Sequence, residues 1–440
     1  MLQEVTDDSD GCGAKFSVII VSDKFEGKPL LQRHRLVNDA LAEELKEIHA
    51  FSQKTLTPEQ WKQHISAPGK VILFGEHAVV YGKTAVAASL NLRTTLYLNE
   101  IQPDNNSAII LELPKVNLIK SIPLNLLLDQ TTPKLSTEGH ESLYKHVQKL
   151  ASTIGIEDNR QKISLECILY AIIQVVQEEG LEPKACKLKL DSELSIGAGA
   201  GSSASFAVCL VAAFLRWSQL QKNPNAPIKF DKDSLEKISK FAFNCEKIMH
   251  GTPSGIDNSI CTFGSIIEFR RGEQPSFIDM GSKSLQVLLV DTCVGRNTKQ
   301  LVDKVAALMA KFPDVIHPIM QSIDAVSKKA IEIFKDMQNV GTDVTRQQNF
   351  HENLADLVRI NHGLLNACQV SHSSLEAIVD SAKKHQFSGK LTGAGGGGFA
   401  YILIPPNASQ DVITNLIREL SESGFKVCVT DLGGPGVRVH

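Results

Sequence analysis

The chain of 440 residues has 42% hydrophobic and 22% charged residues, the composition of an ordinary globular protein with room for several domains. Its net charge of −3 excludes the basic excess of a general nucleic-acid-binding protein. Its nine cysteines form no Cys-x-x-Cys pair and are odd in number, which favours reduced thiols in a cytoplasmic compartment over a disulfide framework.

Residues 1–64 are predicted to form a small α/β unit of their own. The acidic start MLQEVTDDSD lacks the apolar stretch of a secretion signal, so we expect a cytoplasmic protein. The pattern predicts a strand over 15–22, a turn over 25–29, a helix over 31–47 and a short strand over 48–51. Thr57, followed by a proline, predicts the N-cap of a further short helix at Trp61.

Two larger units are predicted to follow, over 65–283 and 284–440. In the first, the turn-like Ala-Pro-Gly-Lys70 precedes a strand over 71–74, further strands fall within 85–112, and helices are expected over 141–180, 203–222 and 232–249. The second begins, after a hinge-like stretch at 281–284, with a buried strand over 285–291. Helices within 299–338 and 352–386, a glycine run over 393–398 and a strand over 399–404 complete it. The fold class is therefore α/β.

The stretch Gly197-Ala-Gly-Ala-Gly-Ser-Ser-Ala204 is predicted to be a phosphate-binding loop. Its small residues leave backbone N–H groups free to surround phosphate oxygens, and the helix after it adds a positive N-terminal end. Ser202 and Ser203 could cap that helix or reach a phosphate-bound Mg²⁺. The loop lacks the lysine of a Walker A motif and the third glycine of a dinucleotide fingerprint. It therefore indicates an enzyme that uses a nucleotide in another way.

The segment Leu194–Leu215 contains no charged residue and is long enough to cross a bilayer. Its first third is glycine and serine, whereas membrane-spanning segments are normally apolar throughout. We therefore expect a helix buried in the core of a globular domain.

Phosphoryl transfer needs a metal ligand, a base and a cation beside the phosphate loop, and the chain offers a candidate for each. Lys70 could steady the transferred group, Glu246 near the end of an amphipathic helix could bind Mg²⁺, and Asp257 could accept a hydroxyl proton. Each also has a plainer interpretation: a surface lysine, a solvated helix charge and a side chain in an Asx turn. The run Gly393–Gly398 matches GxGxxG but precedes a strand, so packing against the first loop explains it better than a dinucleotide site.

Four segments, in this order, resemble the GHMP small-molecule kinases over about residues 65–440. They are 66–92 (SAPGKVILFGEHAVVYGKTAVAASLNL), the loop 195–205, 250–258 (HGTPSGIDN) and 390–398 (KLTGAGGGG). Within that family, Glu76-His77-Ala-Val-Val-Tyr81-Gly-Lys is typical of the mevalonate kinases. Galactokinases carry a Thr-Asp pair after Gly-Glu-His, and phosphomevalonate kinases usually lack the histidine.

The resemblance implies a two-lobed fold with a ribosomal-S5-like N-terminal lobe, a ferredoxin-like C-terminal lobe and ATP between them. It implies that the C5 hydroxyl of mevalonate is phosphorylated with ATP to 5-phosphomevalonate, for isoprenoid and sterol precursor synthesis, by a homodimer. Asp257 would deprotonate the hydroxyl beside Lys70, and Ser203 and Glu246 would hold Mg²⁺. The residues expected to contact mevalonate are Lys70, Glu76, His77, Asp257 and Thr298.

The loop expected to enclose the ATP triphosphate departs from the family pattern at two places. Its residues are Gly197, Ala198, Gly199, Ala200, Gly201, Ser202 and Ser203. Ala200 stands where the family usually has leucine, and Ser195-Ile196 stand where it usually has Pro-Pro. Both changes would alter loop rigidity and nucleotide affinity, but a cradle made of glycines and backbone N–H groups stays possible.

Two other functions remain open from the residues. A related kinase of the family could act on phosphomevalonate or a sugar, and would need other substrate contacts than Glu76 and His77. Alternatively, the kinase part could be inert and the N-terminal unit could be the working part of a binding protein. The presence of Lys70, Ser203, Glu246 and Asp257 together argues against an inert kinase part.

The N-terminal unit resembles the BolA-like family, through SDKFEGKPLLQRHRLVNDALAEEL and EIHAFSQKTLTPEQW. The family's usual first helix is absent, because the chain starts at what would be the first strand. The resemblance implies a monothiol glutaredoxin as partner and a shared [2Fe–2S] cluster with Cys12 and His49 as ligands. From the residues alone, a single strand-end histidine such as His49 is more often packed in a core. The unit could be a vestigial appendage, a fusion of neighbouring coding regions or a working second module.

Overall fold

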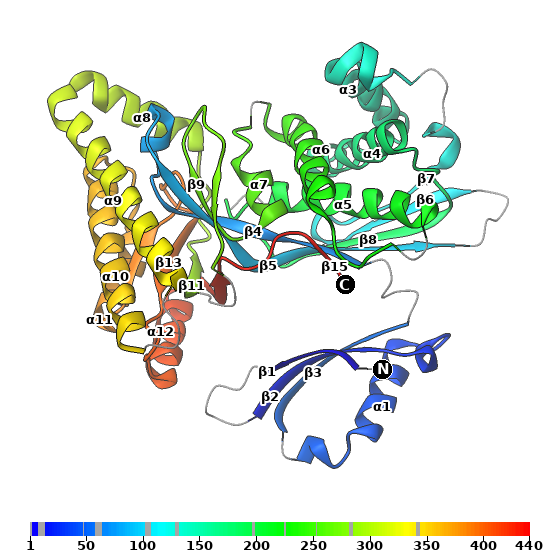
Figure 1. The fold of residues 1–440 in the computed structure, drawn as a ribbon, viewed down its shortest axis with the longest axis horizontal. Coiled ribbons are helices and arrows are strands. Elements are labelled where there is room, and N and C mark those ends of the chain that lie inside the picture. Colours follow the sequence, from blue (N-terminus) through cyan, green and yellow to red (C-terminus); the bar gives the residue numbers. More distant parts are fainter. Residues whose placement is uncertain are drawn as a thin grey trace.

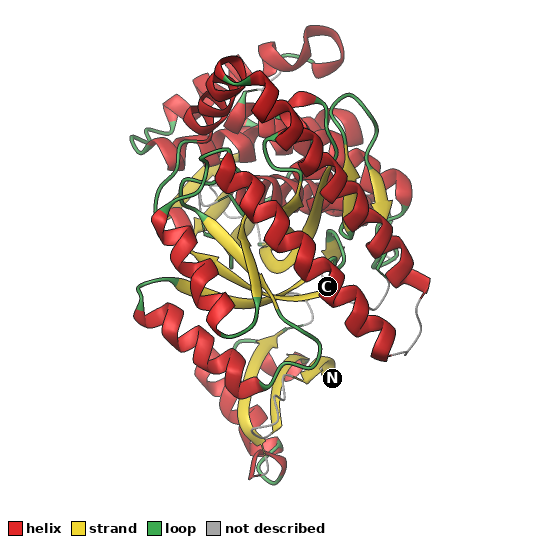
Figure 2. Cartoon of the chain, turned by 90° about the vertical axis from the view of Figure 1, so that its left-hand side faces the viewer, coloured by secondary structure: helices red, strands yellow, loops and turns green. Residues whose placement is uncertain are grey.

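The computed structural model of the chain describes residues 2–7, 14–46, 48–57, 64–101, 107–127, 132–195, 199–223, 226–251, 253–280, 285–339 and 344–440. The N-terminal unit forms a three-stranded sheet separate from the larger one, and Figures 1 and 2 both show it below the main body. β1 (Leu2–Asp7) runs antiparallel to β2 (Ala14–Val21), which pairs in parallel with β3 (Ile48–Leu56). The helix α1 (Leu30–Ala40) makes the crossover that a parallel pair requires.

Two expectations for this unit need correction. The helix expected over 31–47 ends at Ala40, and a 3₁₀ turn over Glu44–Lys46 follows. The strand expected over 48–51 continues to Leu56, because its polar residues pair with β2 as far as Val21. Pairing of the backbone outweighs the weak strand propensity of those polar residues. The helix expected at Trp61 and the proposed ligand Cys12 lie outside the described residues.

A twelve-stranded mixed sheet spans the described part of the larger body (Figure 1), with a central order β12-β13-β11-β14-β5-β8-β6-β7. Beside this path, β4 pairs with β5 and β15, and β9 pairs with β5 and β10. The strands are β4 (His64–Phe74), β5 (Ala85–Glu100), β6 (Ala108–Leu113), β7 (Leu118–Pro123), β8 (Cys186–Ser192), β9 (Ile266–Phe269), β10 (Ser276–Ile278), β11 (Leu285–Asp291), β12 (Ser388–Leu391), β13 (Phe399–Leu403), β14 (Lys426–Leu432) and β15 (Arg438–Val439).

Helices pack on this sheet in two groups, at opposite ends of the view in Figure 1. The first group contains α3 (Leu135–Thr153), α4 (Asn159–Glu179), α5 (Ser202–Lys222), α6 (Lys232–His250) and α7 (Ile256–Phe263). The second contains α8 (Thr298–Lys311), α9 (Pro313–Asn339), α10 (Val344–Ala367), α11 (Ser373–Lys384) and α12 (Gln410–Glu422). Separate apolar cores form under each group, which agrees with a two-lobed α/β body. The domain boundaries at 64/65 and 283/284 stay predictions.

Two further expectations differ from the structure in the first lobe. The turn-like Ala-Pro-Gly-Lys70 is part of β4, where a register shift between Pro68 and Gly69 accommodates the proline that cannot donate to the ladder. The helical stretch 141–180 is two helices, and Asp158 caps the second by accepting from the Gln161 backbone N–H at 2.9 Å.

The expectation of a buried core helix after the phosphate loop is confirmed. The helix α5 is long and apolar enough to cross a membrane by composition, but most of it lies inside the protein. Residues from Ala204 to Ser218 are buried along most of its length between α4, α6 and the sheet. The N-terminal end of α5 reaches a cavity with Ser202, Ser203 and Phe206.

Candidate active site

A cleft of about 660 Å³ lies at the N-terminal end of α5 and receives residues from both lobes. It is lined by Lys70, Ile72, Thr94, Leu113, Lys115, Val116, Arg160, Ile163, Ser164, Leu190, Ser192, Gly199, Gly201, Ser202, Ser203, Phe206, Glu246, Met249, His250, Pro253, Ser254, Asp257, Arg296, Thr298, Gly393 and Ala394. One part of this lining is apolar and comes from the sheet and α4, while another part carries the glycines, hydroxyls and charges. Such a cleft can hold a flat apolar group next to a polyanion.

Lys70 and Asp257 face each other in the cleft. Lys70 lies on β4 and Asp257 in the first turn of α7, and Lys70 Nζ is 3.1 Å from Asp257 Oδ1. The lysine side chain is 10% exposed and the aspartate 33%, so the carboxylate remains open to a ligand while its cationic partner is buried. The turn Pro253–Gly255, whose Gly255 has a φ of 82°, directs α7 so that Asp257 points into the cleft.

Ser203 and Glu246 also meet in the cleft. The Ser203 hydroxyl donates to Glu246 Oε1 at 3.4 Å, and His250 Nε2 lies 2.9 Å from the same hydroxyl oxygen. Glu246 is 2% exposed, and burial followed by the nearby charge of Asp257 raises the pKa of its carboxyl to about 7, against the opposing effect of Lys70. A carboxylate held in this way favours a cation beside it.

Two glycines shape the described part of the predicted phosphate loop. Gly199 has a φ of 91° and Gly201 a φ of 75°, a region that residues with a side chain rarely adopt. A Cβ at Gly201 would lie 2.6 Å from Lys70 Cγ, so the loop approaches Lys70 as closely as glycine allows. The Lys70 backbone N–H also donates to the Ala200 carbonyl at 2.9 Å. Gly197 and Ala198 lie outside the described residues.

Arg296 is a cleft residue that the sequence reasoning missed as a functional group. Its guanidinium lies between the two glycine-rich segments: a Cβ at Gly199 would be 1.6 Å from one terminal nitrogen, and a Cβ at Gly393 2.9 Å from the other. It donates to the Thr392 carbonyl at 3.3 Å, and burial lowers its pKa. The two glycine runs therefore face each other across this arginine. The only signal in the sequence was its position just before the N-cap of a helix, Asn297.

Three of the residues expected to contact the substrate, Glu76, His77 and Thr298, differ in where the structure places them. Thr298 lines the cleft at the start of α8. Neither Glu76, 1% exposed, nor His77, 5% exposed, is among the described residues that line it. Glu76 forms an ion pair with Lys390, and His77 Nε2 lies 2.9 Å from the carbonyl oxygen of Ala394, which does line the cleft.

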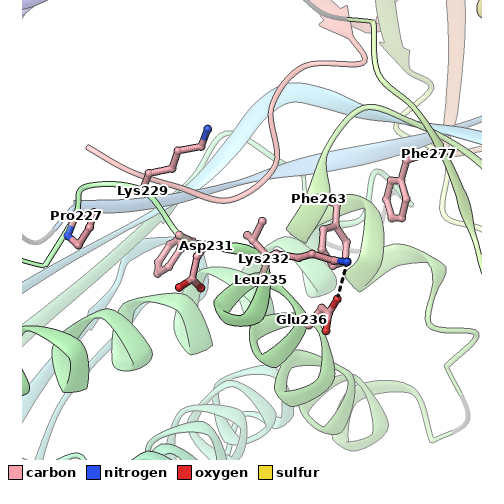
Figure 3. Close-up of a pocket in the computed structure, with 9 residues that line it drawn as sticks. Pro227, Lys229, Asp231, Lys232, Leu235, Glu236, Phe263 and Phe277 are labelled. Carbon is pink, nitrogen blue, oxygen red and sulfur yellow. Dashed lines mark ion pairs between the residues drawn. The ribbon is translucent and has the colours of Figure 1, made fainter.

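A second cavity, of about 690 Å³, lies between α6, Phe263 of α7 and Phe277 of β10 (Figure 3). Its lining is mostly apolar, and two of its charged groups, Lys232 and Glu236, pair with each other at 3.8 Å. It contains none of the hydroxyls, glycines or buried carboxylates of the first cleft. The chemistry therefore belongs to the cleft at α5.

The residues present fit a magnesium ion bound together with phosphate. Mg²⁺ prefers oxygen ligands and usually keeps several waters, with one or two protein ligands and phosphate oxygens. The Ser203 hydroxyl and the buried Glu246 carboxylate are such ligands and lie side by side. No group of three histidine, cysteine, aspartate or glutamate side chains that could hold a metal occurs among the described residues, so the ion would need oxygens of the nucleotide.

The comparisons with known proteins follow the same division of the chain. Residues 167–265 match the model of the GHMP kinases N-terminal domain, residues 344–426 the GHMP kinases C-terminal model, and residues 3–60 the BolA-like protein model. Mevalonate kinase from Bos taurus is 36% identical over 384 residues, covering 86% of this chain and 94% of that protein. Mevalonate kinase from Homo sapiens is 35% identical with the same coverage. The crystal structure of Methanococcus jannaschii mevalonate kinase superposes with a TM-score of 0.61 at 25% identity, covering 87% of this chain and 100% of that one.

Proposed function

The chain belongs to the GHMP kinase family, with mevalonate kinases among its relatives, and on this premise we propose that it phosphorylates the C5 hydroxyl of mevalonate with ATP. The observation that carries the proposal is the meeting of Lys70, Asp257, Ser203 and Glu246 in one cleft at the N-terminal end of α5. Relatives that align over nearly their whole length are named for this activity, which favours mevalonate over phosphomevalonate or a sugar.

The residues of the cleft have different roles in phosphoryl transfer. Asp257 accepts the hydroxyl proton, and Lys70 at 3.1 Å stabilises the carboxylate and the charge that develops on the transferred group. The backbone of residues 199–203 and the N-terminal end of α5 surround the triphosphate. Ser203 and Glu246 would hold Mg²⁺, which neutralises phosphate charge when bound. Thr298 is the proposed contact on the substrate side, and His77 supports the cleft wall from behind Ala394.

A coupled assay of ADP release tests this proposal. The full chain is offered Mg-ATP with mevalonate, phosphomevalonate or galactose in separate reactions. We expect turnover only with mevalonate. Turnover only with phosphomevalonate or galactose would move the chain to another substrate of the same family, and ADP release independent of any alcohol would contradict phosphoryl transfer to a substrate.

For the N-terminal module we propose a monothiol glutaredoxin as partner, with a shared [2Fe–2S] cluster bound through Cys12 and His49. The support is the match of residues 3–60 to the BolA-like model and the position of His49 on β3. Co-expression with a monothiol glutaredoxin should give a coloured complex with visible absorbance. The same experiment with Cys12→Ala and His49→Ala should give colourless protein, and unchanged absorbance in both variants would refute these ligands.

We also propose a homodimer in the cytoplasm, as the resemblance to the family suggests. Light scattering of the purified full chain measures the first part directly. A mass of about 96 kDa, twice the 48.0 kDa of the chain, is expected. A monomer across the micromolar range would contradict it.

A further inference from the structure

A buried ion pair joins the two lobes behind the cleft, and nothing in the proposed transfer uses it. Lys390 Nζ, on β12 of the second lobe, contacts Glu76 Oε1 in the turn after β4 of the first, and both side chains are fully buried. The second carboxylate oxygen accepts from Asn361 Nδ2 of α10 at 3.0 Å. The lysine ammonium also donates to the Leu391 carbonyl at 2.7 Å.

Such a pair is expensive to bury, so its stabilising effect alone does not account for it. Desolvation of two charges offsets much of their attraction, and apolar residues of similar volume often replace a buried pair without loss of stability. A buried ion pair with few alternative partners can instead fix the geometry between the two segments that carry it. The segments in this case are the turn 75–77 and the segment 391–394, and Gly393 and Ala394 of the second segment line the cleft.

Hydrogen bonds carry this geometry from the pair to the cleft. His77, the neighbour of Glu76, meets the carbonyl of Ala394 at 2.9 Å, and Ala394 lines the cleft. Thr392, two residues after Lys390, donates through its hydroxyl to the Ile72 carbonyl of β4 at 2.7 Å. The carbonyl of the same Thr392 accepts from Arg296 at 3.3 Å. A shift between the turn 75–77 and the segment 391–394 would therefore move both His77 and Arg296.

We propose that Glu76 and Lys390 are positioning residues for phosphoryl transfer, acting as a cross-lobe pair that holds His77 and Arg296 at the back of the cleft. This deepens the proposed function and rests on it. Neither side chain touches the substrate, because both are enclosed by protein. The pair acts through the His77–Ala394 and Arg296–Thr392 contacts, so its loss should impair turnover more than nucleotide binding.

The double variant Glu76→Gln/Lys390→Met tests the proposal, because it removes both charges and leaves no buried charge unpaired. We expect it to fold, with a Tm within a few degrees of wild type. The segment 199–203 and the Lys70–Asp257 pair are also held by contacts of their own, such as the hydrogen bond from the Lys70 N–H to the Ala200 carbonyl, so the affinity for a fluorescent ATP analogue should change less than about threefold. The kcat should fall at least about tenfold, a rise in barrier of about 1.4 kcal/mol. A folded double variant with kcat and KM within twofold of wild type would overturn the proposal.

A second measurement is independent of the substrate and separates failure of this proposal from failure of the proposed function. Amide hydrogen exchange followed by mass spectrometry reports on the segment 391–398, whose Thr392 N–H donates to Phe399 and whose Gly396 N–H donates to Val370. In the double variant this segment and the turn 75–77 should exchange faster, while α5 stays unchanged. Unchanged exchange in both segments would overturn the proposal even if the wild type proved inactive on mevalonate.

The matched control is Lys335→Met. Lys335 of α9 pairs with Glu268 of β9 at 3.3 Å, but its side chain is 53% exposed and that of Glu268 33% exposed. An exposed pair of this kind contributes little to geometry or stability. We expect wild-type kcat and wild-type exchange in this control. A loss of kcat as large as in the double variant would mean that any change of charge impairs the enzyme, and would overturn a specific role for Glu76 and Lys390.

Discussion

Arg296 lies between the two glycine runs, and only the tertiary structure brings it there. Arg296 contacts a phosphate-loop glycine from the first lobe and Thr392 from the second, and it lines the cleft. Its half-buried guanidinium keeps fixed donors close to where the triphosphate is proposed to lie, a situation in which arginine stabilises phosphate charge bidentately. Lysine cannot reproduce that fork.

Arg296→Met is therefore expected to lower kcat/KM for ATP by about 10²-fold, the scale of removing one charge-stabilising donor. Arg296→Lys should recover only part of the loss, because one charge remains without the planar fork. Steady-state kinetics at varied ATP measure both. Arg418→Met, an exposed residue of α12 that pairs only with Asn415 among the contacts described, is the control. Activity of Arg296→Met equal to that of the control would contradict the role of Arg296.

Glu246 makes the stability of the nucleotide-free protein depend on pH. Burial and the charge of Asp257 raise the pKa of this carboxyl from 4.5 to about 7 in the folded protein. Between pH 4.5 and 7 the folded state thus holds a proton that the unfolded state has lost. The stabilisation of the folded state by this proton is fully present below pH 4.5 and is lost as pH rises through 7. Between pH 5.5 and 8 the loss is about 2 kcal/mol.

Glu246→Gln should remove this dependence. In urea unfolding without nucleotide or Mg²⁺, the variant should gain about 2 kcal/mol over wild type on going from pH 5.5 to pH 8. The comparison between the two proteins cancels the titration of groups that do not interact with Glu246. Parallel pH dependence of the two free energies of unfolding would show that Glu246 titrates normally.

Some of the site residues could be predicted from the sequence and others could not. Lys70, Glu246 and Asp257 each stand in a local pattern with a chemical meaning, and the structure brings all three into one cleft. Arg296 stands in no such pattern, and Lys390 opens the segment 390–398 without an assigned role, because the partners of both lie about a hundred or more residues away along the chain. Glu76 shows the converse: its motif is clear, but only the fold reveals that its carboxylate has protein partners.

At the scale of elements, the loop before α5 depends on its two left-handed glycines. Gly201 adopts a φ of 75° and leaves no room for a Cβ, which would meet Lys70 Cγ at 2.6 Å. Gly155 shares the conformation, with a φ of 68°, but nothing lies within 4 Å of its Cβ position. Alanine at each of these two glycines therefore separates backbone strain from displacement of Lys70.

Gly201→Ala should therefore reduce kcat/KM at least about tenfold and destabilise the protein by about 1–3 kcal/mol, because the lysine stem must move. Gly155→Ala should cost only the strain of the left-handed conformation, about 1–2 kcal/mol, with unchanged activity. Kinetics and urea unfolding of both variants provide the check. Equal losses of activity would mean that strain, and not crowding of Lys70, is responsible.

Whether a segment forms a helix or a strand was more predictable than the residues at which it begins and ends. The strand at 285–291 and the helix after the phosphate loop were expected from apolar runs and agree with β11 and α5. The Ala-Pro-Gly-Lys70 segment resembled a turn locally, but long-range pairing with β5 makes it a strand. In the same way, pairing with β2 extends β3 beyond the range that its composition indicated.

At the scale of the whole molecule, the two sheets share no strand in the described part of the chain. The first described strand of the larger sheet, β4, begins at His64, whose ring stacks on Tyr97 and on His440 with centroids 4.5 Å apart in both cases. The first strand of the body thus pairs with β5 and with the C-terminal strand β15. The two family resemblances predicted an N-terminal unit separate from the larger body. The local sequence pattern did not indicate that His64 stacks on Tyr97 and His440.

Removal of residues 1–63 should accordingly leave kcat and both KM values within about twofold of the full chain. The truncated chain keeps His64 and its stacking partners, so thermal unfolding should show that it folds. A folded truncated chain with activity reduced tenfold or more would show that the N-terminal module takes part in catalysis.

The central claim, transfer of a phosphoryl group to mevalonate with Asp257 as base, is tested most directly by ³¹P nuclear magnetic resonance. The full chain and Asp257→Asn are each incubated with Mg-ATP and mevalonate while the spectra are recorded. The account predicts that a phosphomonoester signal grows as the γ-phosphate signal of ATP declines, and that the variant, which still binds ATP, shows neither change. Formation of inorganic phosphate alone, or equal phosphomonoester from the variant, would contradict it.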